Sequence, residues 1–363
     1  MKVGIPKEIK DHEYRVAITP SGVQAFKAHG HEVLIETNAG LGSTFTNEEY
    51  QQAGAKIVSS ADEVFAQADM ILKVKEPQPE ECSKLRENQV LFTYLHLAAD
   101  REQTANIMKS GCVAIAYETI QLPNGSLPLL TPMSEIAGRM SVQIGAQYLE
   151  KRNGGRGVLM GGVSGVPSAN VVIIGAGVTG TQAAKVALGM GAFVTIIDRN
   201  IDRLRYLDDI LSGRFETVAS DIGSIARSVK FADLLVGAVL IPGAKAPMLV
   251  SEDMVKTMKE GSVIVDISID QGGCVETILP TSHSNPTYIK HGVIHYGVTN
   301  MPGAVPRTST YALTNSTLPY ALLLADKGYP AAIEGNEPLR QGVNIEKGKI
   351  VYPVVAAAFP DLV

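Results

Sequence analysis

The sequence carries one glycine pattern whose spacing suits the binding of a dinucleotide. Gly175, Gly177 and Gly180 form the pattern G-x-G-x-x-G, between the apolar segment Val171–Ile174 and a predicted helix at Thr181–Met190. In a Rossmann unit the first glycine allows a tight turn, the second lets the backbone approach the pyrophosphate, and the third lets helix and strand pack closely. The pyrophosphate then lies at the helix N-terminus, where N–H groups and the helix dipole favour anions.

A carboxylate follows the next predicted strand at the distance that this fold requires. Phe193–Ile197 leads into Asp198, about 20 residues beyond the glycines, where a carboxylate can accept hydrogen bonds from both ribose hydroxyls. The same charge would repel the 2′-phosphate of NADP, so NAD is the favoured cofactor. Arg199 weakens this preference slightly, because an arginine could pair with that phosphate. The alternative is a glycine-rich turn with a surface aspartate, which the strand–turn–helix context disfavours.

Three side chains near the ends of predicted N-terminal strands could bind and protonate a small substrate. Arg15 lies in the loop after the first strand, Lys75 ends another, and His96 follows the strand Val90–Tyr94. Because the carboxyl ends of parallel strands meet at one edge of a sheet, we expect all three to reach one rim. There the two cations could hold a carboxylate, and the imidazole could exchange a proton near neutral pH. Solvated surface charge or a structural histidine remains the alternative for each residue taken alone.

Two aspartates in the second half of the chain are candidates for an acid–base or orienting role. We expect Asp270, which follows the segment Val263–Ile269, to extend the fifth strand of the dinucleotide-binding unit near the nicotinamide. A carboxylate there could hydrogen-bond a reacting water or orient an ammonium group. A turn aspartate ahead of Gly272 and Gly273 is an equally good interpretation. Asp266 has a similar setting, and spacing does not choose between the two aspartates.

The composition argues against several other classes of protein. The chain has 363 residues, a net charge of −5 and three cysteines. The negative charge gives no basic face for nucleic acid, and an odd number of cysteines without a pairing pattern is typical of a reducing compartment. We find no charged leader and no apolar run of about 20 residues, so we expect a cytoplasmic protein with no membrane partner. Cysteines and histidines do not cluster at ligand spacings, so we predict no metal site.

Alternating strand and helix signals predict an α/β fold with two doubly wound domains. The first series of predicted strands comprises Val3–Ile5, Val33–Ile35, Met70–Val74, Val90–Tyr94 and Val113–Ala116. The second series comprises Val171–Ile174, Phe193–Ile197, Thr217–Val218, Leu234–Val236, Val263–Val265 and Val293–Tyr296. Strands separated by helices are typical of a mostly parallel sheet with helices on its faces. Six strands in this order fit a complete dinucleotide-binding domain.

Polar residues ahead of apolar periodic segments predict where three helices begin. Thr19 is expected to cap one helix, with Pro20 in its first turn. Thr46 with Glu49, and Ser60 with Glu63, each fit the capping-box pattern.

Longer-range patterns predict how the chain divides into domains. Met133–Arg152 and Ser309–Asp326 are predicted helices, and the glycine-rich stretch 157–165 is predicted to be an irregular hairpin or loop. The C-terminal tail shows little regular pattern, and we expect it to pack back on the first domain and make that domain discontinuous. The predicted domains are a substrate domain of residues 1–133 and 305–363 and an NAD-binding Rossmann domain of residues 134–304.

Several segments resemble one known family. They read MKVGIPKEIKDHEYRVAITP at 1–20, KVKEP at 73–77, VIIGAGVTGTQAAKVALGMGAFVTIID at 172–198, VDISIDQGG at 265–273 and TNMPGAVPRTSTYALTN at 299–315, together with the strand before His96. These motifs resemble the alanine dehydrogenase and nicotinamide nucleotide transhydrogenase family over essentially the whole chain.

The resemblance implies an NAD-dependent, reversible oxidative deamination of L-alanine to pyruvate and ammonium by a homohexamer. It implies that Arg15 and Lys75 bind the substrate carboxylate, and that His96 and Asp270 have acid–base roles. It implies cofactor contacts at Ser134, Gly175, Gly177, Val178, Thr179, Gly180, Asp198, Arg203, Ser220, Val239, Leu240, Ile267, Ser268, Ile269, Asp270, Val298, Thr299, Asn300 and Met301.

The sequence departs from the family pattern at two positions. Leu279 stands where many members carry an arginine that contributes to cofactor binding, and Ser268 stands where alanine is more frequent. The first change puts one cofactor contact in doubt. Three alternatives stay open: the soluble NAD(H)-binding component of a transhydrogenase, another amino-acid dehydrogenase of related build, and an NAD-binding module without activity.

Overall fold

The apolar segments of the N-terminal third form six neighbouring parallel strands of one sheet in the computed structural model, which describes residues 1–240 and 245–362. They are β1 (Lys2–Ile5), β2 (Glu32–Glu36), β3 (Lys56–Val58), β4 (Met70–Leu72), β5 (Val90–Thr93) and β6 (Val113–Ala116). Their spatial order is β6-β5-β4-β1-β2-β3, so the winding reverses between β1 and β4 as in a doubly wound sheet. The strands β4, β5 and β6 are buried throughout, as parallel strands covered on both faces must be.

The helices of this part begin where polar side chains can satisfy their first N–H groups. They are α1 (Pro20–Ala28), α2 (Asn47–Gln52), α3 (Ala61–Gln67), α4 (Pro79–Cys82) and α5 (Arg101–Ser110), with short 3₁₀ turns η1 (Leu41–Ser43), η2 (Leu97–Ala99) and η3 (Tyr117–Thr119). The cap at Thr19 and the capping box at Thr46 are confirmed. The capping box predicted at Ser60 is only partly correct. The Ser60 side chain caps α3, but the Glu63 carboxylate accepts a hydrogen bond from the Ser59 hydroxyl and not from the Ser60 backbone.

The C-terminal segment returns to the same sheet. It contains α11 (Pro306–Lys327), α12 (Tyr329–Ile333), α13 (Glu337–Gly342), β14 (Val343–Glu346), β15 (Lys349–Ile350), α14 (Pro353–Ala358) and η7 (Pro360–Leu362). The prediction of an irregular tail was therefore wrong, because β14 pairs with β6 and β15 with β14, both antiparallel. Neither strand is an apolar run: β14 reads Val-Asn-Ile-Glu, and β15 has only two residues, Lys349 and Ile350.

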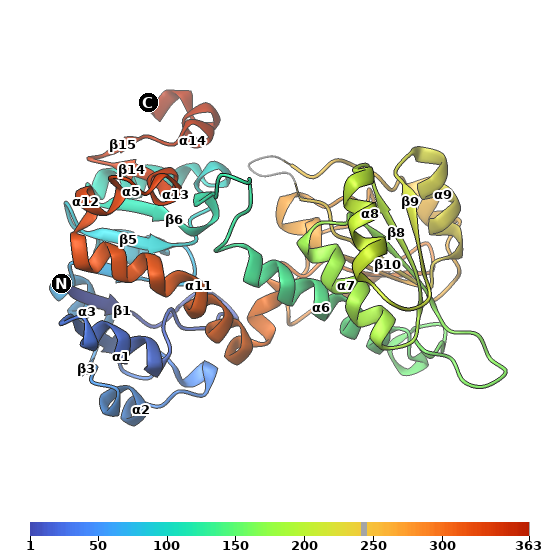
Figure 1. Cartoon of the computed structure of the whole chain (residues 1–363), viewed down its shortest axis with the longest axis horizontal. Helices are drawn as coiled ribbons and strands as arrows, with labels where there is room; N and C mark the ends of the chain where they lie inside the picture. Colours follow the sequence, from blue (N-terminus) through green and yellow to red (C-terminus); the bar gives the residue numbers. More distant parts are fainter. Residues whose placement is uncertain (241–244, 363) are drawn as a thin grey trace. The chain divides into compact units, whose positions relative to one another are not determined.

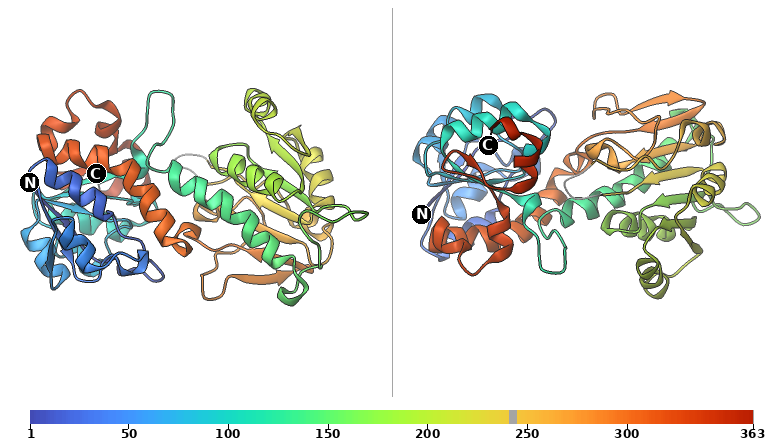
Figure 2. Two further views of the ribbon diagram at one scale, coloured as in Figure 1. Left: turned by 60° about the horizontal axis from the view of Figure 1, so that its bottom comes forward. Right: turned by 90° about the horizontal axis from the view of Figure 1, so that it is seen from above.

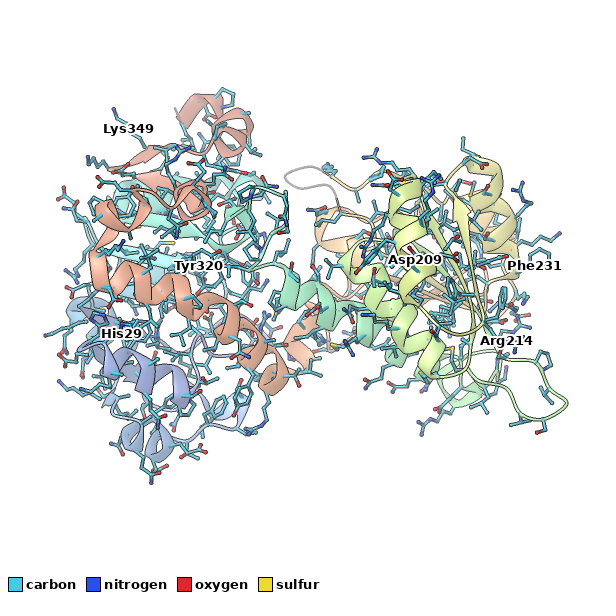
Figure 3. All side chains as sticks on the ribbon, viewed as in Figure 1. His29, Asp209, Arg214, Phe231, Tyr320 and Lys349 are labelled. Atoms are coloured by element: carbon cyan, nitrogen blue, oxygen red, sulfur yellow. The ribbon has the colours of Figure 1, made fainter. Side chains whose placement is uncertain are left out.

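Contacts between α11 and the N-terminal segments hold this return in place. Figure 1 shows α1 and α11 side by side. His29, which is labelled in Figure 3 and caps the end of α1, has its Nδ1 3.0 Å from the Asp326 carboxylate on α11. Near the other end of α11, the Thr310 hydroxyl accepts a hydrogen bond from the Val16 N–H at 3.1 Å.

The middle of the chain builds a second sheet of the same kind. Its strands are β7 (Asn170–Ile174), β8 (Phe193–Asp198), β9 (Phe215–Ala219), β10 (Leu234–Gly237), β11 (Val263–Asp266), β12 (Thr287–Lys290) and β13 (Val293–Tyr296). The order β12-β13-β11-β10-β7-β8-β9 contains the six predicted strands in the Rossmann arrangement. The edge strand β12 was not predicted, and it pairs antiparallel with β13.

Helices lie on both faces of each sheet (Figure 2). The helical elements of the middle segment are α6 (Thr131–Tyr148), η4 (Lys151–Asn153), α7 (Val178–Gly189), α8 (Ile201–Ile210), α9 (Ile222–Phe231), α10 (Glu252–Lys256), η5 (Ile267–Gln271) and η6 (Met301–Ala304). The glycine-rich stretch before β7 is an irregular hairpin, as predicted, with one bridge between Val163 and Val166. No helix in the described ranges combines the length and apolar character that crossing a membrane requires.

The chain separates into two units, which confirms the predicted α/β class with two doubly wound sheets. Unit 1 consists of Met1–Met133 and Gly303–Val363, and unit 2 consists of Ser134–Pro302.

A buried ion network anchors the first turns after β1 and β4 in unit 1. The Lys73 ammonium is fully buried, with Glu81 Oε1 at 2.7 Å and Glu8 Oε2 at 3.0 Å. These two carboxylates hold the pKa of Lys73 above its usual range against the effect of burial. Burial raises the pKa of Glu8 above its usual range, and the charges of Glu81 and Glu13 raise it further. Lys73 opposes this rise, but its charge is shared with Glu81. Lys73 is therefore the charge that makes the burial of two carboxylates tolerable.

Replacing Lys73 with methionine should destabilise the protein by about 3–5 kcal/mol, because two buried carboxylates would lose their counter-charge. The free energy of unfolding from chemical denaturation measures this. The control is Lys10→Met, which removes the 40% exposed partner of Glu76 and should cost about 1 kcal/mol or less. Equal stability of the two variants would contradict the role assigned to Lys73.

Candidate functional site

The loop between β7 and α7 shows why two of the three glycines of the motif are required. Gly175 has a φ of +104°, and a Cβ there would lie 2.4 Å from the Ala238 oxygen. A Cβ on Gly180 would lie 1.8 Å from the Gly175 oxygen, so only glycine lets α7 pack against this turn. A Cβ on Gly177 would meet no protein atom within 4 Å. Packing within the protein therefore explains the first and third glycines, whereas the second borders open space where a phosphate could approach.

A charged side chain, that of Arg203, contacts the start of α7. The helix starts at Val178 without a side-chain cap, and both Gly177 and Val178 are exposed. The Arg203 guanidinium donates to the Ala176 oxygen at 2.7 Å and to the Thr181 hydroxyl at 2.8 Å. An uncapped helix N-terminus with an arginine beside it fits the pyrophosphate of a dinucleotide.

Asp198 closes the same loop from the end of β8. Its carboxylate accepts hydrogen bonds from the Ala176 N–H at 2.6 Å and from the Asn200 N–H at 2.8 Å. The side chain is only half-buried. These bonds hold the carboxylate at the carboxyl edge of the sheet, beside the glycine loop, which fits the ribose-binding role expected from the sequence.

The other candidate cofactor residues of unit 2 follow the ends of neighbouring strands. The Ser220 N–H, after β9, donates to the backbone oxygen of Asp198 at 3.0 Å. The Val239 N–H, after β10, donates to the Ser268 hydroxyl at 3.0 Å, so the unusual serine ties the β10 and β11 ends together. The remaining candidates are Ser134 in α6, Thr179 in α7, the exposed Leu240, Ile267 and Ile269 in η5, Val298, Thr299 and Asn300 after β13, and Met301 in η6. The side chains of Val298 and Met301 are buried, and Leu279 is 61% exposed.

The structure distinguishes the roles of Asp266 and Asp270, which their spacing in the sequence could not do. Asp266 is fully buried at the end of β11 and accepts hydrogen bonds from the N–H groups of Ser268, Cys274 and Val275 at 2.8–3.1 Å. Burial raises the pKa of the Asp266 carboxyl, and these donors oppose the rise. The expectation that Asp270 extends the strand was wrong, because β11 ends at Asp266 and Asp270 lies in η5. Asp270 is exposed, and its Oδ1 accepts the Asn300 N–H at 3.3 Å. Asp266 thus holds the turn, and Asp270 is the carboxylate that a ligand can reach.

In unit 1, Arg15, Lys75 and His96 follow three adjacent strands. The strands β5, β4 and β1 are neighbours and parallel, so their carboxyl ends share one edge. The Thr93 hydroxyl donates to the Lys75 backbone oxygen at 2.9 Å, which connects the ends of β5 and β4, and the Tyr94 ring lies parallel to the His96 ring. Burial raises the pKa of the Tyr94 hydroxyl above its usual range, and the positive charge of Arg15 opposes this rise.

Arg15 is not a solvated surface charge. It is 2% exposed, and Glu13 binds it with both oxygens, through Nε at 2.6 Å and Nη2 at 2.5 Å. Its Nη1 lies 3.1 Å from the Met133 sulfur. Burial would lower the pKa of Arg15, but the Glu13 carboxylate raises it above its usual range. The guanidinium is therefore charged and fixed in one orientation, as a carboxylate clamp requires.

Lys75 is half-buried and follows the Lys73 network directly. Glu8 Oε1 accepts the Val74 N–H at 2.6 Å and the Lys75 N–H at 3.4 Å. The Lys75 charge also acts on Glu76: burial would raise the pKa of that carboxyl, but Lys75 and Lys10 hold it below its usual range. The backbone that carries the Lys75 ammonium is thus held by a buried carboxylate.

His96 has an unusual backbone conformation. Its φ of 51° and ψ of 36° are left-handed, which costs about 1 kcal/mol or more for a residue other than glycine. The Glu118 carboxylate accepts the His96 N–H at 2.6 Å and the Leu95 N–H at 3.2 Å. The imidazole itself is 49% exposed. Strain of this kind is found at functional sites and needs contacts that hold it.

Sequence reasoning missed Glu8, Glu13, Tyr94 and Glu118, all of which touch the candidate residues or their backbone. Glu8 and Glu13 stand in the same loop as Arg15, and this concentration of opposite charges between a strand and a helix was the available signal. Glu118 is 22 residues from His96, and only the pairing of β5 with β6 brings them together.

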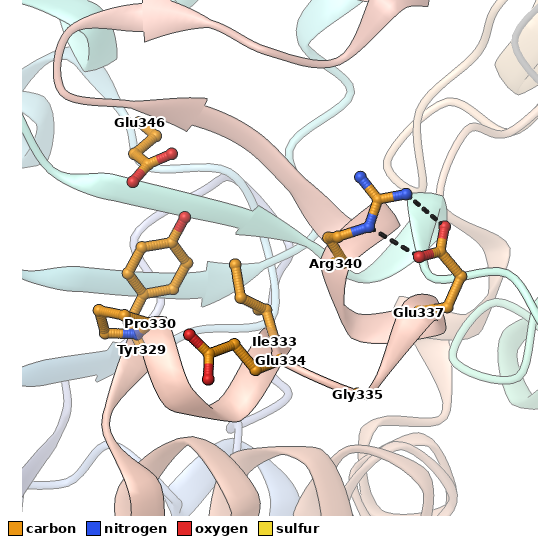
Figure 4. A pocket seen from close by; sticks show the side chains of 8 residues that line it. All are labelled: Tyr329, Pro330, Ile333, Glu334, Gly335, Glu337, Arg340 and Glu346. Carbon is orange, nitrogen blue, oxygen red and sulfur yellow. Dashed lines mark hydrogen bonds and ion pairs between the residues drawn. The ribbon is translucent and has the colours of Figure 1, made fainter.

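A pocket of about 530 Å³ lies elsewhere in unit 1 (Figure 4). It is lined by Tyr329, Pro330, Ile333, Glu334, Gly335, Glu337, Arg340 and Glu346. Arg340 is occupied by both oxygens of Glu337 at 2.6 and 2.7 Å. None of the candidate site residues lines this pocket, so it adds nothing to the rim chemistry.

Unit 2 has the strand order and glycine loop of a dinucleotide-binding Rossmann domain, and unit 1 presents two cations and a histidine at parallel strand ends. These features are typical of the class of two-domain α/β proteins that use a dinucleotide cofactor. Residues 4–137 match the family described as alanine dehydrogenase/PNT, N-terminal domain, and residues 141–353 match the corresponding C-terminal domain. The chain belongs to the alanine dehydrogenase/PNT family.

Individual relatives agree with this assignment. The chain is 61% identical to the alanine dehydrogenase of Methanococcus maripaludis, over 99% of this chain and 96% of that protein. It is 58% identical to the alanine dehydrogenase of Staphylococcus epidermidis, over 99% and 97%. A solved structure of L-alanine dehydrogenase matches with a TM-score of 0.97 at 54% identity, covering all of both chains. A transhydrogenase structure from Sinorhizobium meliloti matches with a TM-score of 0.82 at 26% identity, over 97% and 99% of the two chains.

Replacing Gly180 with alanine should destabilise unit 2 by about 1–3 kcal/mol or more, because the new methyl group would press on a backbone oxygen. Gly189 at the end of the same helix is the matched control, since a Cβ there would meet nothing within 4 Å. Gly189→Ala should be neutral or stabilise by up to about 1 kcal/mol. Thermal unfolding of both variants measures the difference, and a Gly180→Ala protein as stable as Gly189→Ala would refute the packing argument.

Proposed function

We propose that this chain is an NAD-dependent alanine dehydrogenase, which interconverts L-alanine with pyruvate and ammonium. The observation that carries the proposal is the 58–61% identity to proteins named alanine dehydrogenase over nearly the whole chain. The glycine loop and the cationic rim supply the parts that such a reaction needs: a dinucleotide site and groups for a small carboxylate.

Residues of unit 2 would hold the cofactor. The N-terminus of α7 with Gly177 and Arg203 suits the pyrophosphate, and Asp198 suits the ribose and favours NAD over NADP. When bound, NAD accepts the hydride of alanine, and NADH returns it in the reverse direction. The protein contributes position and charge around this transfer.

Residues of unit 1 would hold the substrate carboxylate. Arg15 is fixed by Glu13 before any ligand arrives, so little conformational entropy is lost when it binds an anion. Lys75 adds a second positive charge at the same edge of the sheet, which can attract the carboxylate.

His96 and Asp270 would handle the protons. Histidine is the side chain that most often transfers protons in catalysis, and His96 supplies a half-exposed imidazole at the sheet edge. Asp270 can orient an ammonium group or a water molecule, which its exposed carboxylate supports. The choice of Asp270 over Asp266 rests on the complete burial of Asp266 and its three N–H partners.

The alternative is the soluble NAD(H)-binding component of a transhydrogenase. It shares the fold, but the transhydrogenase relative is only 26% identical, against 54% for L-alanine dehydrogenase. An NAD-binding module without activity is disfavoured by a strained, half-exposed histidine at the sheet edge that also carries Arg15 and Lys75.

The test of the function is NADH oxidation by the purified protein with pyruvate and ammonium, each omitted in turn. Consumption that requires both compounds establishes reductive amination, and slower consumption with NADPH supports the role of Asp198. If NADH binds but is not consumed, the dehydrogenase proposal fails, and hydride exchange between nucleotides becomes the next assay.

Removing the side chain of His96, as in His96→Ala, should reduce kcat by about 100-fold or more while the dissociation constant of NADH stays within about twofold, because the residue exchanges protons and does not bind the cofactor. Steady-state kinetics and NADH fluorescence measure the two quantities. An active His96→Ala enzyme would exclude the acid–base role.

Asp270→Asn should also lose turnover while the fold is retained, whereas Asp266→Asn should lower the stability of the protein first.

We also propose a cytoplasmic location and a homohexameric assembly. Sedimentation velocity of the purified protein tests the assembly, and a monomer at micromolar concentration would refute it.

A further inference from the structure

Glu118 joins the strand that carries His96 to its neighbour. It lies in η3, directly after β6, and His96 lies just after β5, which pairs with β6 in parallel. The two segments therefore leave the sheet at the same edge. The Glu118 side chain is 15% exposed and reaches across to the backbone ahead of and at His96.

Both oxygens of Glu118 are used to hold that backbone. Oε1 accepts the His96 N–H at 2.6 Å, and the Leu95 N–H lies 3.2 Å from Oε1 and 3.3 Å from Oε2. Hydrogen bonds to an ionised acceptor are about twice as strong as neutral ones. They offset the cost of the left-handed conformation of His96, which local sequence does not favour.

The same carboxylate also faces the imidazole. His96 Nδ1 lies 3.9 Å from Glu118 Oε1, beyond hydrogen-bond distance but close enough for a small ring rotation to close it. Catalytic hydrogen bonds are often long without substrate and shorten in the complex. The plane of the imidazole is parallel to that of the Tyr94 ring, with an interplanar angle of 7° and ring centroids 6.0 Å apart.

Tyr94 limits how the imidazole can move. Its hydroxyl donates to the Leu129 oxygen at 2.6 Å, and the side chain is 3% exposed, so the ring is fixed. The imidazole turns only about its Cα–Cβ and Cβ–Cγ bonds, and the fixed ring beside it narrows the range of these rotations. A small rotation that brings Nδ1 to Glu118 leaves Nε2 directed at other groups.

We propose that Glu118 is the positioning residue for His96: it holds the left-handed backbone and accepts Nδ1–H, so that Nε2 exchanges the proton with the substrate. This inference rests on the proposed function. In each turnover the proton leaves or joins Nε2, the Nδ1–H bond stays intact, and Glu118 stays ionised. The carboxylate thereby selects the tautomer of the neutral ring and stabilises its protonated form.

The central variant is Glu118→Gln, because the amide oxygen can still accept the two backbone N–H groups but the negative charge is lost. We expect kcat to fall by about 10-fold or more, while KM for NADH and the midpoint of thermal unfolding stay close to wild type. The solvent deuterium isotope effect on kcat should increase, because proton transfer becomes slower relative to the other steps. A residue that only supported the fold would lower stability and would leave this isotope effect unchanged.

Two further variants complete the test. Glu118→Asp keeps the charge and should retain more turnover than Glu118→Gln. Glu102→Gln, on the exposed first turn of α5 in the same unit, should match wild type in every measurement. Wild-type kcat and isotope effect in Glu118→Gln, or lower turnover in Glu118→Asp than in Glu118→Gln, would overturn the inference alone. A wild-type protein that does not turn over pyruvate with ammonium would overturn the proposed function, and this inference with it.

Discussion

Hydrogen bonding between the parallel strands β6, β5, β4 and β1 makes four separate chain segments leave one sheet at the same edge. Arg15, Lys75, His96 and Glu118 each follow one of these strands. A slip of one residue in this pairing would turn every side chain to the other face of its strand. The register therefore determines which residues can act together, and the buried apolar strands keep that register.

The second constraint on unit 1 is the local balance of buried charge. Arg15 and Lys73 are both almost fully removed from solvent, and each has a carboxylate oxygen within 3 Å. Glu8, Glu13 and Glu81 supply these oxygens, so carboxylates exceed cations by one in this group, consistent with the raised pKa of Glu8. Such groups are costly to bury, and they persist where orientation matters more than stability. Here they orient the backbone and the guanidinium that the proposed substrate needs.

The two units use one topology for two purposes. In each, the strand order reverses beside the first strand, and the first strand–helix connection lies at that switch point. In unit 2 this connection is the short glycine loop from Ile174 to Val178, which presents backbone N–H groups. In unit 1 it is the longer loop from Ile5 to Pro20, which presents Glu8, Glu13 and Arg15. In the proposed function, equivalent positions thus serve a phosphate in one unit and a carboxylate in the other.

The sequence by itself determined the α/β class, most strands, the glycine loop with Asp198, and the rim residues, because each depends on a local period or on spacing within one strand–helix step. Tertiary structure decided what local pattern cannot encode. It distinguished Asp266 from Asp270, because burial and the N–H donors of Cys274 and Val275 come from a turn beyond the strand. It revealed the partners Glu13 for Arg15 and Glu118 for His96, and it turned the tail into the strands β14 and β15. These features depend on strand pairing and on a polar group's need for a partner once water is excluded, and both exist only in the folded chain.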